Sequence, residues 1–134
     1  MTLAIYKRER EGILILALHG QLTLGDEDLA FRTTMESCIN AGNLRIILDC
    51  RQLASIEAAG VDTLVSCQAE LHQAGGKIVL TEVERTRMEL PIMAKLEVEF
   101  DVFPDEQEAV NSFFPERALH RYDILQYIRE QTGQ

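Results

Sequence analysis

The histidines of this chain belong to no recognisable catalytic motif. His19, His72 and His120 lie in three different segments, and no serine or cysteine forms a recognisable nucleophile motif with any of them. An exposed or hydrogen-bonded histidine accounts for each one without catalysis. The sequence therefore offers no general base for an activated nucleophile.

The three cysteines form neither a metal motif nor a redox motif. Cys38, Cys50 and Cys67 are spaced by 12 and 17 residues, with no CxxC pair and no histidine at ligand spacing. All three lie in apolar, periodic segments, where small core residues are expected. The odd number of thiols fits a reducing compartment.

The remaining polar motifs are explained by helix ends. Asp26, Glu27 and Asp28 stand where a helix should begin, and acids in a first turn complement the helix dipole. Gly75 and Gly76 lack the Lys-Ser/Thr pair or the third glycine that a phosphate-binding loop requires. We therefore expect no metal, no cofactor and no enzymatic activity.

Composition and charge indicate one soluble domain that binds no nucleic acid. The chain has 134 residues, of which 46% are hydrophobic and 26% charged, a balance that supports a single folded core. Its net charge of -9 disfavours nucleic acid and favours basic partners. Residues 1–10 contain no basic segment followed by an apolar run, and no apolar stretch approaches the roughly 20 residues of a membrane span. We expect a cytoplasmic protein without direct membrane insertion.

Apolar runs predict the strands that would position these residues. Leu3–Lys7 and Gly12–His19, separated by a charged connection, predict a hairpin. Leu44–Leu48 is almost continuously apolar and predicts a central strand that is covered on both faces. Lys77–Leu80 and Phe100–Phe103 predict two more strands. A helix between Leu44–Leu48 and Lys77–Leu80 implies a parallel crossover, and hence a mixed sheet.

Apolar stripes at helical spacing predict the first two helices. One begins at Gly25 and ends at Gly42. The other follows a turn at Arg51–Ile56 and stops at Gly75. Both would cover the sheet with their apolar faces.

Proline residues divide the C-terminal third of the chain. The helical segment Glu84–Lys95 should be broken or kinked by Pro91. Asp105, with Glu108 three residues later, should cap a further helix that reaches about Phe114. These features predict a broken or kinked helical segment before the strand at Phe100–Phe103 and a capped helix after it.

The tail after Phe114 predicts one more helix. Pro115 suits a first helical turn, and Leu119, Tyr122, Leu125 and Ile128 recur every three residues. This amphipathic segment either covers an open face of its own sheet or mediates a homodimer.

Several motifs occur in a specific order. Residues 44–80 read LRIILDCRQLASIEAAGVDTLVSCQAELHQAGGKIVL, residues 20–22 are Gly-Gln-Leu, and residues 100–113 read FDVFPDEQEAVNSF. In this order they resemble the STAS domain: a Gly-x-Leu before the first helix, a central strand, a loop ending in an Asp-Ser-Ser-Gly-like tetrapeptide, a helix, a GGxxxL strand and a last strand with its helix. The resemblance covers about 110 residues.

This resemblance implies a fold and a class of function. The fold would be α/β, a mixed sheet of four or five strands with helices packed mainly on one side, formed by residues 1–114. Residues 115–134 would add a C-terminal amphipathic helix packed on the domain. The function would be that of a bacterial anti-sigma factor antagonist, a non-enzymatic regulator of signal transduction and transcription. Such a protein docks reversibly to a kinase-type anti-sigma factor or a related signalling protein.

The tetrapeptide departs from the family pattern. In the antagonist branch a partner kinase phosphorylates a serine early in this motif, but here the motif is Glu57-Ala58-Ala59-Gly60, and Ala58 cannot accept phosphate. Ser55 and Thr63 are weak alternative acceptors, because Ser55 is more simply a helix N-cap and Thr63 an ordinary surface residue. Three readings stay open: constitutive binding, phosphorylation at Ser55 or Thr63, or a cytoplasmic STAS accessory subunit of a membrane transporter.

The same region is the expected partner-binding surface. It comprises the loop 51–56 and the first turns of the next helix, with Ser55, Ile56, Glu57, Ala58, Ala59, Gly60 and Thr63. Glu57 either only complements the helix dipole or presents a fixed negative charge to a basic partner. Gly60 allows close approach, either of the sheet or of a partner.

Overall fold

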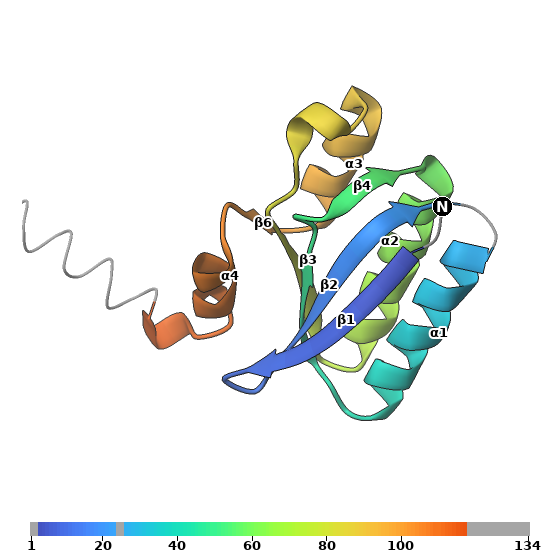
Figure 1. The fold of residues 1–134 in the computed structure, drawn as a ribbon. Coiled ribbons are helices and arrows are strands. Elements are labelled where there is room, and N and C mark those ends of the chain that lie inside the picture. Colours follow the sequence, from blue (N-terminus) through green and yellow to red (C-terminus); the bar gives the residue numbers. More distant parts are fainter. Residues whose placement is uncertain (1–2, 24–25, 118–134) are drawn as a thin grey trace, which may run out of the picture.

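The structure, a computed structural model, describes residues 3–23 and 26–117 of the chain (Figure 1). The elements are, in order, β1 (Leu3–Arg10), β2 (Ile13–Leu22), α1 (Asp26–Asn40), β3 (Arg45–Asp49), β4 (Leu53–Ile56), α2 (Ala58–Gln73), β5 (Lys77–Thr81), the 3₁₀ turn η1 (Arg85–Arg87), α3 (Leu90–Glu99), β6 (Val102–Phe103) and α4 (Glu106–Ser112). The predicted C-terminal helix falls largely on residues 118–134, which lie outside the described residues.

β1 and β2 form the predicted antiparallel hairpin, with longer strands than expected. Arg8, Glu9 and Arg10, which were expected in the connection, continue β1 and pair with β2. The turn consists of Glu11 and Gly12, whose φ values are 54° and 80°. Positive φ at both residues is what a two-residue type I′ turn requires, and its twist matches that of the strands.

The sheet is mixed, as predicted. Its strands follow the order β1-β2-β3-β5-β6, with β4 paired to β2 outside this path. Only the β1–β2 pair is antiparallel. β3 pairs in parallel with β5, from Arg45 opposite Lys77 to Asp49 opposite Thr81, which confirms the expected crossover through α2.

The described sheet has six strands, more than the expected four or five. The additional strand is β4, formed by residues that were expected to be part of a turn. β2 is 10 residues long and β3 only 5, so the second half of β2 needs another partner for its backbone. β4 supplies it: Leu53 lies opposite Gly20, and Ser55 opposite Gln21.

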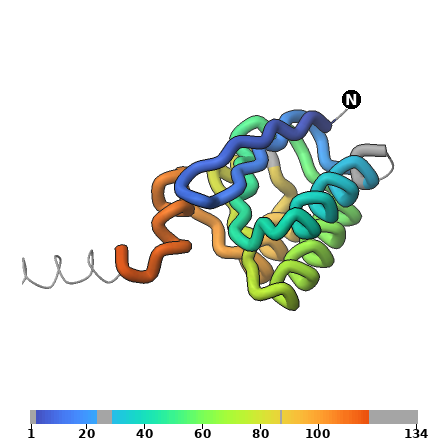
Figure 2. The backbone as a smooth tube through the Cα atoms, turned by 90° about the horizontal axis from the view of Figure 1, so that it is seen from below, coloured from blue at the N-terminus to red at the C-terminus, as the bar shows by residue number. Residues whose placement is uncertain are grey.

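The sheet separates two hydrophobic clusters, and Figure 1 shows the helices that cover its two faces. On the inner face, α1, α2 and α3 bury the larger cluster, which includes Leu16, Leu18, Phe31, Met35, Ile46, Leu48, Leu64, Ile78, Leu80 and Leu96. On the outer face, α4 buries a smaller one, which contains Ile13, Ile15, Ile47, Val79, Ala109 and Val110. Figure 2 shows α1 and α2 running side by side. The described helices thus lie mainly on one side of the sheet, as predicted.

Pro91 begins a helix and does not kink one. The expected helix over residues 84–95 is replaced by η1 and by α3, which starts at Leu90. Pro91 lies in the first turn of α3, where its missing amide hydrogen has no intrahelical partner to lose. α3 runs to Glu99 and covers the inner cluster with Ile92, Met93 and Leu96.

Two smaller predictions are confirmed. Asp105 caps α4, and its side chain accepts a hydrogen bond from the backbone amide of Glu108 at 2.8 Å. Cys38, Cys50 and Cys67 form no disulfide with one another and are buried in the inner cluster. None of the helices in the described ranges combines the length and the apolar character needed to cross a bilayer.

Candidate functional site

The start of α2 is built from an extended residue and a short apolar turn. Glu57 is the N-cap, with φ −93° and ψ 164°, and its side chain makes no capping hydrogen bond. Its backbone amide instead donates to the carbonyl oxygen of Leu22 at 3.0 Å, which ties the helix start to the end of β2. The expectation that Ser55 caps this helix was wrong, because β4 extends to Ile56 and keeps Ser55 in the sheet.

The predicted partner-binding residues divide into an exposed and a buried group. Glu57 and Ala58 are exposed, and Ala59 is half-buried. Ile56 and Gly60 are buried. The surface that another protein can reach is therefore the N-cap and the first turn of α2, and the residues on either side of it support this turn from within.

Gly60 is required by packing against the sheet. A Cβ atom on this residue would lie 2.7 Å from the carbonyl oxygen of Leu22 and 3.1 Å from Cγ1 of Ile56. Real Cβ atoms do not approach backbone oxygen this closely, so only glycine lets the first turn of α2 lie on β2. Of the two explanations for this glycine, approach of the sheet accounts for it fully.

Thr63 is buried, contrary to the expectation of a surface residue. Its side chain is 3% exposed, and its hydroxyl donates to the carbonyl oxygen of Ala59 at 3.1 Å. A kinase has no access to a hydroxyl in this position. Ser55 is half-buried in β4. The structure therefore argues strongly against Thr63 as an alternative phosphate acceptor. It argues less strongly against Ser55.

An apolar groove continues the exposed turn of α2 toward α3. It has a volume of about 210 Å³ and is lined by Ala58, Val61, Asp62, Pro91, Ile92 and Lys95. Beside it, Leu90 at the start of α3 is 85% exposed. Sequence reasoning missed the contribution of α3, because it placed Pro91 inside a helix. The signal for the start of α3 was Pro91 itself, because proline is common in the first turn of a helix.

A larger hollow of about 310 Å³ lies beside β6, but its charges are already paired. It is lined by Arg85, Glu97, Phe100, Asp101, Val102 and Phe103. Arg85 forms an ion pair with Glu97, and Asp101 forms one with Lys77. This hollow thus offers a ligand little unsatisfied chemistry.

Polar groups at the carboxyl ends of β3 and β5 are structural. The buried carboxylate of Asp49 accepts a hydrogen bond from the backbone amide of Arg51 at 3.0 Å and lies 4.0 Å from the guanidinium of Arg8. Its neighbour Thr81 is fully buried, and its hydroxyl has no hydrogen-bond partner. No group of three metal-binding side chains occurs among residues 3–23 and 26–117.

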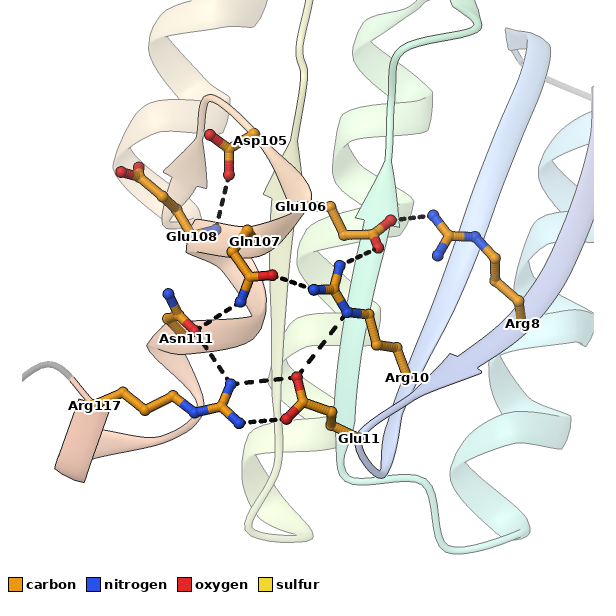
Figure 3. A network of polar contacts seen from close by, with 9 residues as sticks. All are labelled: Arg8, Arg10, Glu11, Asp105, Glu106, Gln107, Glu108, Asn111 and Arg117. Atoms are coloured by element: carbon orange, nitrogen blue, oxygen red, sulfur yellow. Dashed lines mark hydrogen bonds and ion pairs between the residues drawn. The ribbon is translucent and has the colours of Figure 1, made fainter.

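A polar network attaches α4 to the hairpin (Figure 3). Glu106 receives hydrogen bonds from Arg8 and from Arg10, the latter at 2.7 Å. These guanidinium groups lower the pKa of Glu106 to about 2, with the hydrogen bond from Arg8 as the main cause. At the other end of α4, Arg117 pairs with Glu11 in the hairpin turn. The network holds the outer layer in place.

The two histidines in the described part of the chain, His19 and His72, lie on different elements. The ring of His19 packs edge-on against Tyr6, with ring centroids 4.6 Å apart. His72 lies in the last turn of α2, and His120 is outside the described residues.

Burial raises the pKa of the Cys50 thiol to about 12, so it is a poor nucleophile.

Comparison with known proteins gives one family and one fold. Residues 4–109 match the family model described as the STAS domain. A putative anti-sigma factor antagonist from Thermotoga maritima has a TM-score of 0.72 at 16% identity, over 81% of this chain and 92% of that one. The Bacillus cell fate determinant SpoIIAA in its phosphorylated form has a TM-score of 0.61 at 18% identity, over 82% of this chain and 99% of that one. The murine anion transporter Slc26a9 has a TM-score of 0.58 at 17% identity, over 77% of this chain and 18% of that one. No curated protein sequence matches this chain.

Proposed function

The chain belongs to the STAS domain family, and from this premise we propose that it is a non-enzymatic regulatory module that docks to another protein. The docking surface is the exposed first turn of α2 together with the groove beside it. The observation that carries this proposal is the position of Ala58, which is exposed at the first helical residue and also lines the groove.

The surface favours a partner with an apolar anchor and basic flanks. The groove is apolar along Val61, Pro91 and Ile92, and an anchor side chain of the partner would be buried there. Asp62, which lines the groove, and Glu57, the N-cap next to Ala58, are both exposed. The net charge of -9 adds to the attraction of a basic partner and speeds the encounter.

The partner is a kinase-type anti-sigma factor or a related signalling protein. Antagonists of anti-sigma factors share this fold, and one of them, SpoIIAA, is known in a phosphorylated form. In this chain Ala58 stands where the family's phosphorylated serine would be, so docking is not switched at this position. Glu57 supplies a fixed negative charge next to it, and binding is constitutive.

The compartment that we propose is the bacterial cytoplasm. Cys38, Cys50 and Cys67 are buried and form no disulfide with one another, which suits a reducing compartment. In this setting the protein acts on transcription through its partner and not through contact with DNA.

A second function is docking to a membrane transporter as a STAS accessory subunit. The structural match to a segment of Slc26a9, an anion transporter, supports it. This function uses the same surface, and it needs no serine at position 58.

Affinity capture from extract of the native cells tests the proposal. The bait is the full chain, either wild type or with Ala58→Arg, which fills the groove with a charged side chain. Glu70→Arg is the matched control, because Glu70 is exposed near the other end of α2. We expect the wild type and the control to retain a kinase-type anti-sigma factor, and Ala58→Arg to lose it.

Each other outcome counts against part of the proposal. Retention of a transporter subunit that Ala58→Arg abolishes keeps the surface and replaces the partner class. Equal retention by all three baits shows that the groove is not the docking site. Capture of a nucleic acid, or turnover of a small molecule by the chain, would overturn the functional class itself.

A further inference from the structure

α4 covers only part of the outer face of the sheet. Its cluster uses Ile13 and Ile15 in the first half of β2, but no residue from the second half of that strand. Side chains alternate along a strand, and Leu16 and Leu18 pack into the inner cluster. Ala17, His19 and Gln21, which alternate with these inward residues, therefore point to the outer face, in the part that α4 does not cover.

The same alternation in β1 extends this surface. Leu3 and Ile5 pack against the inner cluster, so their neighbours face outward. β1 residues lie opposite β2 residues in the hairpin register, Ala4 with His19 and Tyr6 with Ala17. We call the resulting surface the open outer face; it consists of Ala4, Tyr6, Ala17, His19 and Gln21.

The open outer face exposes an aromatic ring beside small side chains. Tyr6 is 57% exposed, although it lies in the middle of a regular strand. Its ring packs on His19, and two alanines lie opposite these rings in the pairing register. Aromatic rings beside small residues are a surface on which an apolar element can pack.

The sequence after Arg117 needs such a surface. Residues 119–128 contain six large apolar side chains within ten positions: Leu119, Tyr122, Ile124, Leu125, Tyr127 and Ile128. A segment this apolar is stabilised by removing these side chains from water.

The end of the described chain lies within reach of the open outer face. Arg117 pairs with Glu11, and its guanidinium also donates to Asn111 at 3.1 Å, so it is fixed beside the hairpin turn. From Glu11 back to Tyr6 is a strand distance of about 17 Å. Eleven helical residues, 118–128, span about 16 Å.

We infer that residues 118–128 form a helix that packs along β1 and β2 and covers the open outer face. The helix starts at the hairpin turn, continues the outer layer begun by α4 and buries Tyr6. The chain thereby completes its second layer with its own tail, and the surface at the start of α2, on the other side of the sheet, stays available to a partner. This inference is independent of the proposed function.

A spin label on the tail tests the inference in the full chain. Gln126→Cys supplies a label site, and the native cysteines are buried and do not compete. We expect the label to broaden the backbone amide signals of Tyr6, Ala17 and His19, while those of Glu70 and His72, at the far end of α2, keep their intensity. Unchanged signals from the open outer face would overturn the inference.

Two further samples separate intramolecular packing from the alternatives. A mixture of ¹⁵N-labelled chain without spin label and spin-labelled chain without ¹⁵N should show no broadening. Broadening there would show that the tail covers a second copy, and the inference would be wrong. Leu125→Asp in the spin-labelled chain should restore the signals of Tyr6 and Ala17, whereas Gln131→Asp, three residues beyond the proposed contact, should leave them broadened. Equal effects of the two substitutions would also contradict it.

Discussion

The backbone carbonyl of Leu22 accepts a hydrogen bond from the amide of Glu57 and lies directly under the α-carbon of Gly60, where a Cβ atom would approach it to 2.7 Å. One oxygen at the end of β2 thus fixes both the N-cap and the first turn of α2. The exposed side of the same turn, at Glu57 and Ala58, is the proposed docking surface. The packing of the sheet therefore determines how this surface is presented.

Gly60→Ala should destabilise the protein by about 1–3 kcal/mol, although alanine favours helix. The intrinsic gain of about 1 kcal/mol is outweighed because the new Cβ collides with backbone, which cannot rotate away as a side chain would. Denaturant unfolding measures the difference. Ser66→Ala, at an exposed position of the same helix, is the control and should change stability by less than about 0.5 kcal/mol. Equal stability of Gly60→Ala and wild type would contradict the close contact.

Thr81→Val should stabilise the protein by about 1 kcal/mol. The Thr81 hydroxyl is buried without a partner, and valine has the same shape without the polar group. Thr63→Val is the comparison, because the Thr63 hydroxyl has a partner in the carbonyl of Ala59. The midpoint of thermal unfolding should rise for the first variant and not for the second. A lower midpoint for Thr81→Val would indicate a partner for its hydroxyl, such as a bound water.

Glu106→Gln should cost about 1 kcal/mol at pH 7, because it removes the charge that binds Arg8 and Arg10. The folded-state pKa of Glu106 is about 2, below the value of about 4.5 in an unfolded chain. A lowered pKa stabilises the fold above pH 4.5, and this contribution is lost as the pH falls through 2. The stability difference between wild type and variant should therefore shrink from pH 5 to pH 2. A difference that does not change with pH would refute the ion pair.

Cys50 should not react with thiol reagents in the folded protein. Burial, with a smaller contribution from the Asp49 charge, raises its pKa to about 12, so at pH 8 only about one thiol in ten thousand is ionised. Titration with a disulfide reagent should detect no rapid reaction of Cys50 before denaturant is added, and full reaction afterwards. Rapid modification in native buffer would contradict the burial.

The mixed sheet was predictable because its strongest signals are local. The apolar run at 44–48 and the double glycine at 75–76 define a strand, a helix and a second strand, and the structure confirms their parallel pairing. β4 was not predictable in the same way. Its residues 53–56 resemble a turn, and only the unpaired length of β2 makes them a strand.

The candidate site was predictable in sequence position but not in exposure. Glu57 and Ala58 could be placed near a helix start from the motif alone. Burial of Thr63 depends on how α2 lies on the sheet, which local patterns do not contain. The groove depends on α3, whose lining residues are at least 29 positions from those of α2 along the chain and meet them only in the fold.

Hydrogen exchange on the complex with a captured partner tests the central claim most directly. If the first turn of α2 and the adjacent groove hold the partner, the backbone amides of residues 57–62 and 92–95 will exchange more slowly in the complex than in the free chain. The amides of the hairpin turn, Glu11 and Gly12, will be unchanged. Protection confined to the hairpin or to α4, with residues 57–62 exchanging at the same rate in both states, would contradict the account.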